Sequence, residues 1–330
     1  MASAIAALEF MGAAAATTKS RTAAPSPLAK GTFQFYPVPS SMSALRDIAA
    51  GPDGALWFTG SATDKSASAI GRITSSGSIS TYSLPKGSLP SGIVSGPDGA
   101  LWFGEYGAIG RISTSGQIKQ FALSQSRAQV NDLTVGSDGA LWFTLNGEAT
   151  IGRITTSGQV TDYRLPYATA NAIVDGPGGD LYFTYSYLQR VGRLTAKGIY
   201  SDYHLSAGLR PRDLTSLGGY LWLSAVNQNR TLLNICKFTP ATQYYCFWGY
   251  SGGLGTVDGH AVTTAFSKVW GDLDTPGWQI FSTDTQQHVT QYNPSNSPGG
   301  TPSAIVGGPA HALWFTLPTF SAGYIGELSV

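Results

Sequence analysis

An apolar triplet, Leu-Trp-Phe or a close variant of it, recurs along this chain and limits what the chain can fold into. Its copies begin at Leu56, Leu101, Leu141, Leu181, Leu221 and Leu313. Successive copies lie 45, 40, 40, 40 and 92 residues apart, and a degraded copy, Val269-Trp270, divides the last interval. Seven units of roughly 40–46 residues have the length of four-stranded propeller blades.

Each unit carries the pattern of four short strands separated by turns. In the second unit an apolar entry at 93–94 leads to Gly96-Pro97-Asp98-Gly99. Pro presets one turn angle there, and Gly accepts the left-handed geometry that closes a hairpin. The Trp-Phe strand, Ile-Gly-Arg-Ile-Ser at 109–113 and a Ser-Gly turn follow, and each unit ends on an alternating strand such as 159–163. Period-two alternation broken by glycines predicts an all-β fold.

The two ends of the repeat region indicate how the ring closes. The chain ends on 324–328, which matches the third strand of a unit and lacks a fourth strand after it. The segment 32–37 resembles the fourth strand of other units. We therefore predict one seven-bladed β-propeller over 31–330, in which this N-terminal strand completes the last blade and removes the exposed sheet edges. Residues 1–30 form a separate apolar segment and linker.

Composition excludes several classes of protein. Hydrophobic residues make up 42% of the chain, which is enough for a large core and excludes wholesale disorder. The net charge of +1 argues against a nucleic-acid partner, which would require a basic face. No apolar run reaches the ~18–20 residues of a membrane-spanning helix, so no transmembrane span is predicted.

At these repeats the sequence resembles the streptogramin B lyase (virginiamycin B lyase) family of seven-bladed propellers. The shared unit is Gly-Pro-Asp-Gly-Ala-Leu-Trp-Phe-Thr at 51–59, Ile-Gly-Arg-Ile-Thr at 70–74, and a strand ending Tyr-x-Leu-Pro at 82–85. The resemblance runs from about Gly31 to Val330 and is weak between Asn227 and Pro298. It implies the fold more specifically than it implies an activity.

The resemblance implies a lyase that opens a cyclic peptide antibiotic at its ester bond, using Mg²⁺ and a histidine base. In the family the last blade carries Glu-Pro-His and a second Glu after the Trp-Phe strand. Here these positions are Thr301-Pro302-Ser303 and Leu317, so both metal-binding carboxylates and the base are missing. Mg²⁺ prefers carboxylate oxygens, so we expect neither the metal nor the family reaction. A substrate-contacting histidine of the penultimate blade is matched by His260.

Propeller geometry places two rings of residues near one mouth of the channel. The ring equivalent to the family histidine is Arg46, Ser91, Asn131, Asn171, Arg212, His260 and Ser303. The ring after the Trp-Phe strand is Gly60, Glu105, Leu145, Tyr185, Ala225, Asp272 and Leu317. Arg can hold a carboxylate or phosphate bidentately, and Asn can share hydrogen bonds with hydroxyls or amides.

The first hypothesis is that this mouth binds a small polar or anionic ligand, such as a uronate-like sugar or a peptide, or a partner. Its candidate binding residues are Arg46, Asn131, Asn171, Arg212, His260, Glu105 and Tyr185. The alternative is that these side chains pair with Asp47, Asp132, Asp213 and Glu105 and only solvate the rim. The three aspartates follow ring residues in alternate blades, and backbone hydrogen bonding is the simplest role for them.

A second hypothesis assigns chemistry to the same mouth without a metal. An elimination needs a base with a pKa near neutrality and a positive group for the developing enolate. His260 would be the base and Arg212, in the adjacent blade, the stabilising cation. The sequence contains no pattern typical of calcium or zinc ligands.

The two cysteines are predicted to form a disulfide. Aligning 234–239 with 150–155 makes Cys236 equivalent to Gly152 and Cys246 equivalent to Asp162. If Ile154 pairs with Val160 across the hairpin, these two positions face each other, close enough for a bridge. A disulfide in turn indicates an oxidising compartment, whether extracellular, cell-surface or periplasmic.

The first thirty residues leave three interpretations open. Residues 2–16 are apolar with Glu9 as their one charge, and a Pro-Ser-Pro linker follows at 25–27. The segment matches a secretory signal in part, although no basic residue precedes the apolar run. It also weakly resembles a polymerising pilin-like helix, which would make the propeller the headgroup of a self-associating filament or surface subunit. A cloning-derived leader is the third interpretation.

Overall fold

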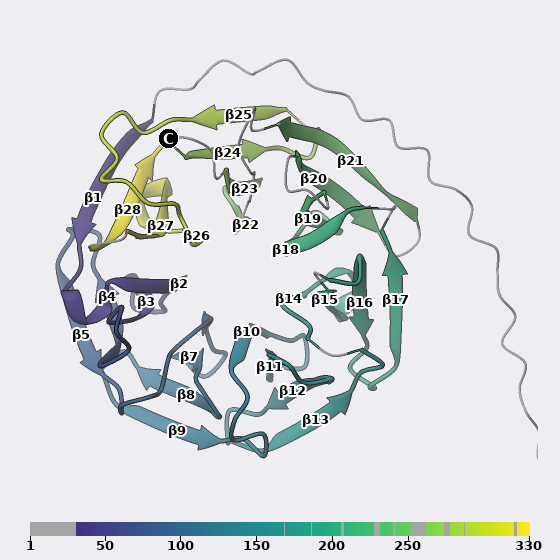
Figure 1. Ribbon diagram of the computed structural model, residues 1–330, viewed down its shortest axis with the longest axis horizontal. Helices are drawn as coiled ribbons and strands as arrows, with labels where there is room; N and C mark the ends of the chain where they lie inside the picture. The colour runs from purple at the N-terminus through teal and green to yellow at the C-terminus, as the bar shows by residue number, and fades with distance from the viewer. Residues whose placement is uncertain are drawn as a thin grey trace, which may run out of the picture.

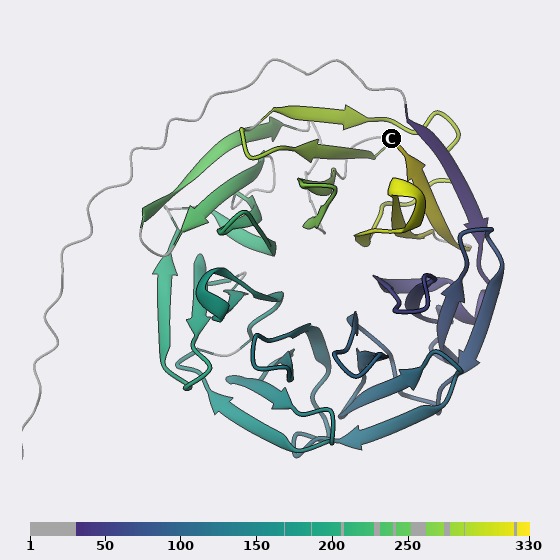
Figure 2. The same cartoon turned by 180° about the vertical axis from the view of Figure 1, so that it is seen from behind.

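The computed structural model describes residues 31–330 except 168, 186, 206–207, 228–231, 240–241, 252–261, 274–277, 287 and 320–321. In this part of the chain, 28 strands form seven four-stranded antiparallel sheets. The sheets stand side by side around a central channel, with inner strands such as β2, β10 and β18 nearest the axis (Figure 1). The opposite face shows the same closed ring (Figure 2).

The strands follow the predicted units one after another. Blades 1 to 3 are β2 (Ala44–Ala50), β3 (Leu56–Ser61), β4 (Ser68–Ile73), β5 (Ile79–Ser83); β6 (Ile93–Ser95), β7 (Ala100–Gly104), β8 (Ala108–Ser113), β9 (Ile118–Ala122); β10 (Val130–Val135), β11 (Leu141–Leu145), β12 (Thr150–Ile154), β13 (Val160–Arg164). Blades 4 and 5 are β14 (Ile173–Asp175), β15 (Leu181–Tyr185), β16 (Arg190–Leu194), β17 (Tyr200–His204); β18 (Arg210–Leu217), β19 (Tyr220–Val226), β20 (Leu232–Thr239), β21 (Thr242–Ser251). Blades 6 and 7 are β22 (Val262–Ala265), β23 (Lys268–Leu273), β24 (Gln279–Thr283), β25 (Val289–Tyr292); β26 (Ala304–Gly307), β27 (Ala312–Pro318), β28 (Gly323–Ser329). Single 3₁₀ turns lie at η1 (Ser40–Met42), η2 (Pro177–Gly179) and η3 (Pro309–His311).

The N-terminal strand closes the ring, as the sequence predicted. Strand β1 (Thr32–Pro37) pairs antiparallel with β28, and the sheet order of the last blade is β1-β28-β27-β26. The outermost strand of blade 7 therefore comes from the other end of the chain. This pairing locks the first and last blades together and leaves no open gap between them.

The Leu-Trp-Phe triplet forms the contact between neighbouring blades. Successive side chains of a strand point to opposite faces of its sheet. Trp57 of blade 1 accordingly packs in one core cluster with Leu101 and Phe103 of blade 2. The same arrangement recurs around the ring, and Trp314 of blade 7 packs with Leu56 and Phe58 of blade 1. The fold is thus held by seven apolar interfaces, one at each junction between described blades.

The aspartate of the Gly-Pro-Asp-Gly turn ties this tryptophan to its own blade. Asp53 accepts the indole N–H of Trp57 at 3.0 Å and the Nε–H of Arg72 at 2.7 Å. The Arg72 guanidinium lies over the indole, 5.8 Å from the ring centroid. Burial pushes the pKa of Asp53 upward, but these hydrogen bonds outweigh burial and hold the pKa below its usual value. Blades 2 and 3 repeat the arrangement, so the arginine that recurs at this place in the units has a structural role.

The glycine of Ile-Gly-Arg-Ile makes room for the phenylalanine of the triplet. Gly71 pairs with Phe58 across the sheet, and a Cβ on Gly71 would lie 2.2 Å from ring carbons of Phe58. Four other blades repeat this contact, in the pairs Gly110–Phe103, Gly152–Phe143, Gly192–Phe183 and Gly326–Phe315. In blade 5 the smaller Leu223 replaces the phenylalanine, and Cys236 occupies the glycine position opposite it.

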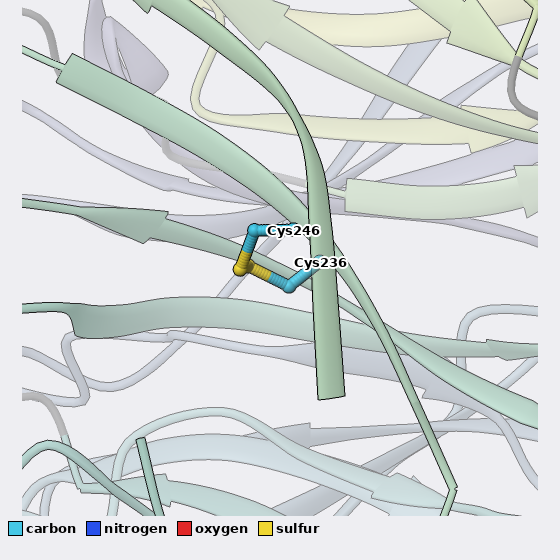
Figure 3. Close-up of a disulfide and its surroundings, with 2 residues drawn as sticks. All are labelled: Cys236 and Cys246. Atoms are coloured by element: carbon cyan, nitrogen blue, oxygen red, sulfur yellow. A yellow bond between two sulfur atoms is a disulfide. The ribbon is translucent and has the colours of Figure 1, made fainter. Parts of the chain in front are cut away.

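The predicted disulfide forms at this altered position. Cys236 of β20 pairs with Cys246 of β21, and the two are joined by a disulfide (Figure 3). The register on which the prediction rested is also correct, because Ile154 pairs with Val160 and Gly152 with Asp162. Cys236 thus occupies the position of the glycine in other blades, and its bridge links the two outer strands of blade 5, β20 and β21.

The phenylalanine–glycine contact gives a test of blade packing. We expect Gly110→Ala to lower the free energy of unfolding by about 1–3 kcal/mol, because its methyl group would overlap the Phe103 ring. Phe103→Leu combined with Gly110→Ala should cost less than the sum of the two single changes, since blade 5 combines Leu223 with the larger Cys236. Chemical denaturation of the three variants measures this coupling. Strictly additive costs would contradict the steric explanation.

Candidate functional site

A cavity of about 690 Å³ lies at the end of the channel where the inner strands begin. Six of the seven predicted ring positions line it: Arg46, Ser91, Asn131, Asn171, Arg212 and Ser303. They converge because each occupies the same place at the start of an inner strand in a different blade. The seventh position, His260, lies outside the described residues, so its proposed role as a base stays a prediction.

Four further polar residues of the cavity were missed by the sequence argument, one of them Ser61 at the end of β3. Lys65 comes from the loop between β3 and β4, Asn146 follows β11, and Gln129 precedes β10. The repeat aligns strands but does not align loops, whose lengths differ between blades. The one available signal was the unusually long connection of blade 1, which carries Lys65 to the mouth.

The second predicted ring does not border the cavity. Glu105 is fully buried, accepts a 2.6 Å hydrogen bond from the Gln120 amide, and has a pKa raised mainly by burial. Tyr185 is also fully buried, and its ring meets Tyr167 and Phe183. Glu105 and Tyr185, which the sequence placed at the mouth, therefore do not line this cavity. The end of a blade's second strand lies one strand farther from the axis, where side chains pack between sheets.

Three aspartates on the cavity wall fasten neighbouring blades together. Asp47 accepts the backbone N–H of Ile48 at 2.8 Å through one oxygen and that of Ile93, in blade 2, at 2.7 Å through the other. Asp132 joins blade 3 to blade 4 and Asp213 joins blade 5 to blade 6 in the same way. The expected hydrogen bonding to backbone is confirmed, and it extends across the blade junctions.

A local irregularity in the inner strand presents each aspartate to the next blade. The pairing of inner and second strands shifts register between Leu45 and Ile48, and at the equivalent places in blades 3 and 5. Such a bulge re-aims two side chains that regular alternation would send to opposite faces. One of them, Arg46, Asn131 or Arg212, lines the mouth, and the aspartate after it reaches the neighbouring backbone.

The pKa values of the three carboxyl groups are raised. Burial is the largest cause, and it brings the pKa of Asp47 to about 6 and that of Asp213 to about 7. The pKa of Asp132 lies well above its usual value because of burial and the charges of Asp47 and Asp213. The cavity lining therefore combines carboxyl groups of raised pKa with the cations Arg46, Lys65 and Arg212.

The fold and the cavity define a seven-bladed propeller with a polar pocket at one channel mouth. The model of the virginiamycin B lyase family matches residues 14–243. The chain therefore belongs to the virginiamycin B lyase family. A search of curated proteins finds no significant match.

Solved structures share this architecture. A streptogramin B lyase is 24% identical, with a TM-score of 0.76 over 91% of this chain and 97% of its own. A catalytically inactive virginiamycin B lyase from Staphylococcus aureus, crystallised with quinupristin, is 23% identical, with a TM-score of 0.77 over 91% and 100% of the two chains. The extracellular domain of the hybrid two-component system BT4673 from B. thetaiotaomicron is 14% identical, with a TM-score of 0.65 over 90% and 42%. At these identities the similarity shows a common fold.

The residues present do not fit the metal that the family resemblance implies. Leu317 is fully buried in an apolar cluster with Trp278 and Phe315 and has no side-chain oxygen. Thr301 provides a neutral hydroxyl where the family has a carboxylate. Among the described residues, no group of three or more His, Cys, Asp or Glu side chains is placed to hold a metal ion. No reaction step through Mg²⁺ is derived for this chain.

The raised carboxyl pKa values give a pH-dependent stability. Asp213 binds its proton more tightly in the folded chain than in the unfolded chain, so folding takes up protons between about pH 4 and 7. This contribution to stability is complete below the unfolded pKa and is lost as the pH rises through the folded pKa. We expect the melting temperature to fall less steeply over this window in Asp213→Asn than in the wild type. Thermal melts from pH 4 to 8 measure the slope.

The control for this experiment is Asp162→Asn, which changes an exposed carboxylate on the outer strand β13. It should keep the wild-type slope. The absolute stability of Asp213→Asn is expected to drop as well, because an amide nitrogen cannot accept the N–H of Val262. A slope in Asp213→Asn equal to that of the wild type would contradict the assignment.

Proposed function

We propose that this chain is a secreted or cell-surface propeller that binds a small polar or anionic ligand in the channel-mouth cavity. The observation that supports this most directly is the convergence of Arg46, Arg212 and Lys65 with several amide side chains on one cavity. Ligand sites are concave, partly apolar, and carry a few placed polar groups. A cavity of 690 Å³ lies within the usual range of about 300–1,000 Å³ for such sites.

Two observations support a location outside the cytosol. Disulfides persist in oxidising compartments, and Cys236 is bridged to Cys246. A propeller of the same fold is the extracellular domain of a two-component system. No helix among the described residues is long and apolar enough to cross a membrane.

The binding proposal is tested by removing the exposed cation at the rim. We expect Arg46→Ala to weaken binding of an anionic ligand about tenfold or more, because a charge-assisted hydrogen bond is lost. Isothermal titration with ligands found in a thermal-shift screen of small anions measures the effect. Arg127→Ala, an exposed arginine that does not line the cavity, should leave affinity unchanged. The proposal would be overturned if Arg46→Ala and Arg212→Ala both bound every ligand found with the same affinity as the wild type.

We further propose that the family's Mg²⁺-dependent elimination is absent. Thr301 and Leu317 support this, since neither can supply a carboxylate. A streptogramin B incubated with the protein and Mg²⁺ should therefore remain cyclic. Chromatography separates the cyclic compound from its linear isomer, and an active enzyme of the family serves as the positive control. Metal-dependent ring opening at a rate comparable to that control would show that the proposal is wrong.

A further inference from the structure

We infer that the ligand of this cavity is a polyhydroxylated carboxylic acid of mono- or disaccharide size, a uronate-type sugar acid. The inference rests on the proposed ligand-binding function and narrows it to one chemical class. It depends on three features of the cavity: where the cations lie, where the amides lie, and which hydrogen-bonding groups fill the wall between them.

Two of the three cations stand across the channel from the amides, and the third, Arg212 of β18, belongs to blade 5, next to the amides of blade 4. Arg46 and Lys65 both belong to blade 1, in β2 and in the loop after β3. The amides of Asn131, Asn146 and Asn171 belong to blades 3 and 4. Strands β2 and β14 face each other across the channel (Figure 1). A ligand that spans the mouth therefore meets the two exposed cations, Arg46 and Lys65, at one end, and the amides, with Arg212 in the next blade, at the other.

The cation side is suited to a carboxylate. Arg46 is exposed at the rim, and Lys65 is exposed on the neighbouring loop. A guanidinium binds a planar carboxylate through two parallel hydrogen bonds, and an ammonium adds a second charge nearby. One negative group on the ligand is thus enough to engage the basic side of the cavity.

The remaining wall is suited to hydroxyl groups. Asn side chains both donate and accept hydrogen bonds, whereas the carboxylates of Asp47, Asp132 and Asp213 only accept them when ionised. Each oxygen of those carboxylates accepts one backbone N–H and retains a further lone pair. A sugar hydroxyl donates and accepts at once, and it can therefore satisfy both kinds of group.

A simple anion does not match this wall. Acetate has acceptor oxygens for Arg46 and Lys65 but no hydroxyl groups for the amides or for the carboxyl groups of Asp47, Asp132 and Asp213. A neutral sugar matches the amides and the carboxyl groups but leaves the cations without an anion. Apolar side chains among the lining, including Leu89, Ala172 and Leu214, provide surface for the C–H face of a sugar ring.

The experiment compares four probes that separate the two halves of the ligand. D-glucuronate and D-galacturonate carry both the carboxylate and the hydroxyls, D-glucose carries the hydroxyls alone, and acetate carries the carboxylate alone. We expect titration calorimetry and saturation-transfer NMR to show binding of at least one uronate, at least tenfold tighter than glucose or acetate.

Variants on the two sides of the cavity should act differently. Arg46→Ala and Lys65→Ala should each reduce the preference for uronate over glucose roughly tenfold, since they remove a charge-assisted contact. Asn146→Ala should weaken uronate and glucose alike, because it removes a hydroxyl contact and leaves the charge in place. Both kinds of variant change exposed side chains and should fold normally, and Arg127→Ala should match the wild type.

The outcomes distinguish this inference from the proposed function. If acetate or another simple anion binds as tightly as the uronates and depends on Arg46, the sugar-acid class is wrong and ligand binding at this mouth stands. If only zwitterionic peptides bind, the sugar-acid class is likewise wrong and ligand binding at this mouth stands. If no probe and no compound of the small-anion screen shows binding that depends on Arg46 or Arg212, both proposals fail.

Discussion

The packing of one blade's tryptophan against the next blade's leucine and phenylalanine is the contact on which this propeller depends. A single four-stranded sheet would leave one apolar face exposed, and the triplet sends Trp57 to one side of its sheet and Leu56 and Phe58 to the other. Each blade is therefore covered on both faces only when it has two neighbours. The ring satisfies this requirement for every blade when Trp314 reaches Leu56 and Phe58 and β1 completes blade 7.

The other recurrent motifs adjust the chain to that contact. The glycine of Ile-Gly-Arg-Ile gives the phenylalanine ring space, and the turn aspartate fixes the indole and the arginine over it. Where Leu223 replaces the phenylalanine, the glycine position accepts Cys236 and the blade gains a disulfide. Ala310 replaces the aspartate in blade 7, and the Trp314 indole N–H has no hydrogen-bond partner among the described residues. The apolar contact persists there without the polar support.

Near the axis, the same architecture supports a second set of interactions. Asp47, Asp132 and Asp213 join alternate pairs of blades through backbone N–H groups, and they do so from the wall of the cavity. The bulges that aim these aspartates also bring Arg46, Asn131 and Arg212 to the mouth. The same pairs of neighbouring residues therefore both join the blades and line the cavity. Leu317 is buried in an apolar cluster between blades and does not line the cavity.

The sequence by itself determined the number of blades, their strand order, the ring closure, the disulfide and six of the described cavity positions. Each of these follows from a periodic pattern, because residues at the same position of each repeat occupy equivalent positions in the fold. The tertiary structure alone decided which side chains reach the cavity. It buried the side chains of Glu105 and Tyr185 between adjacent sheets, where the neighbouring blade decides the packing. It brought Lys65 and Asn146 to the mouth from loops that share no repeat. It also placed Asp47 and Asp213 close enough to Asp132 to raise the pKa of Asp132, a consequence of distance across the channel that no sequence spacing records.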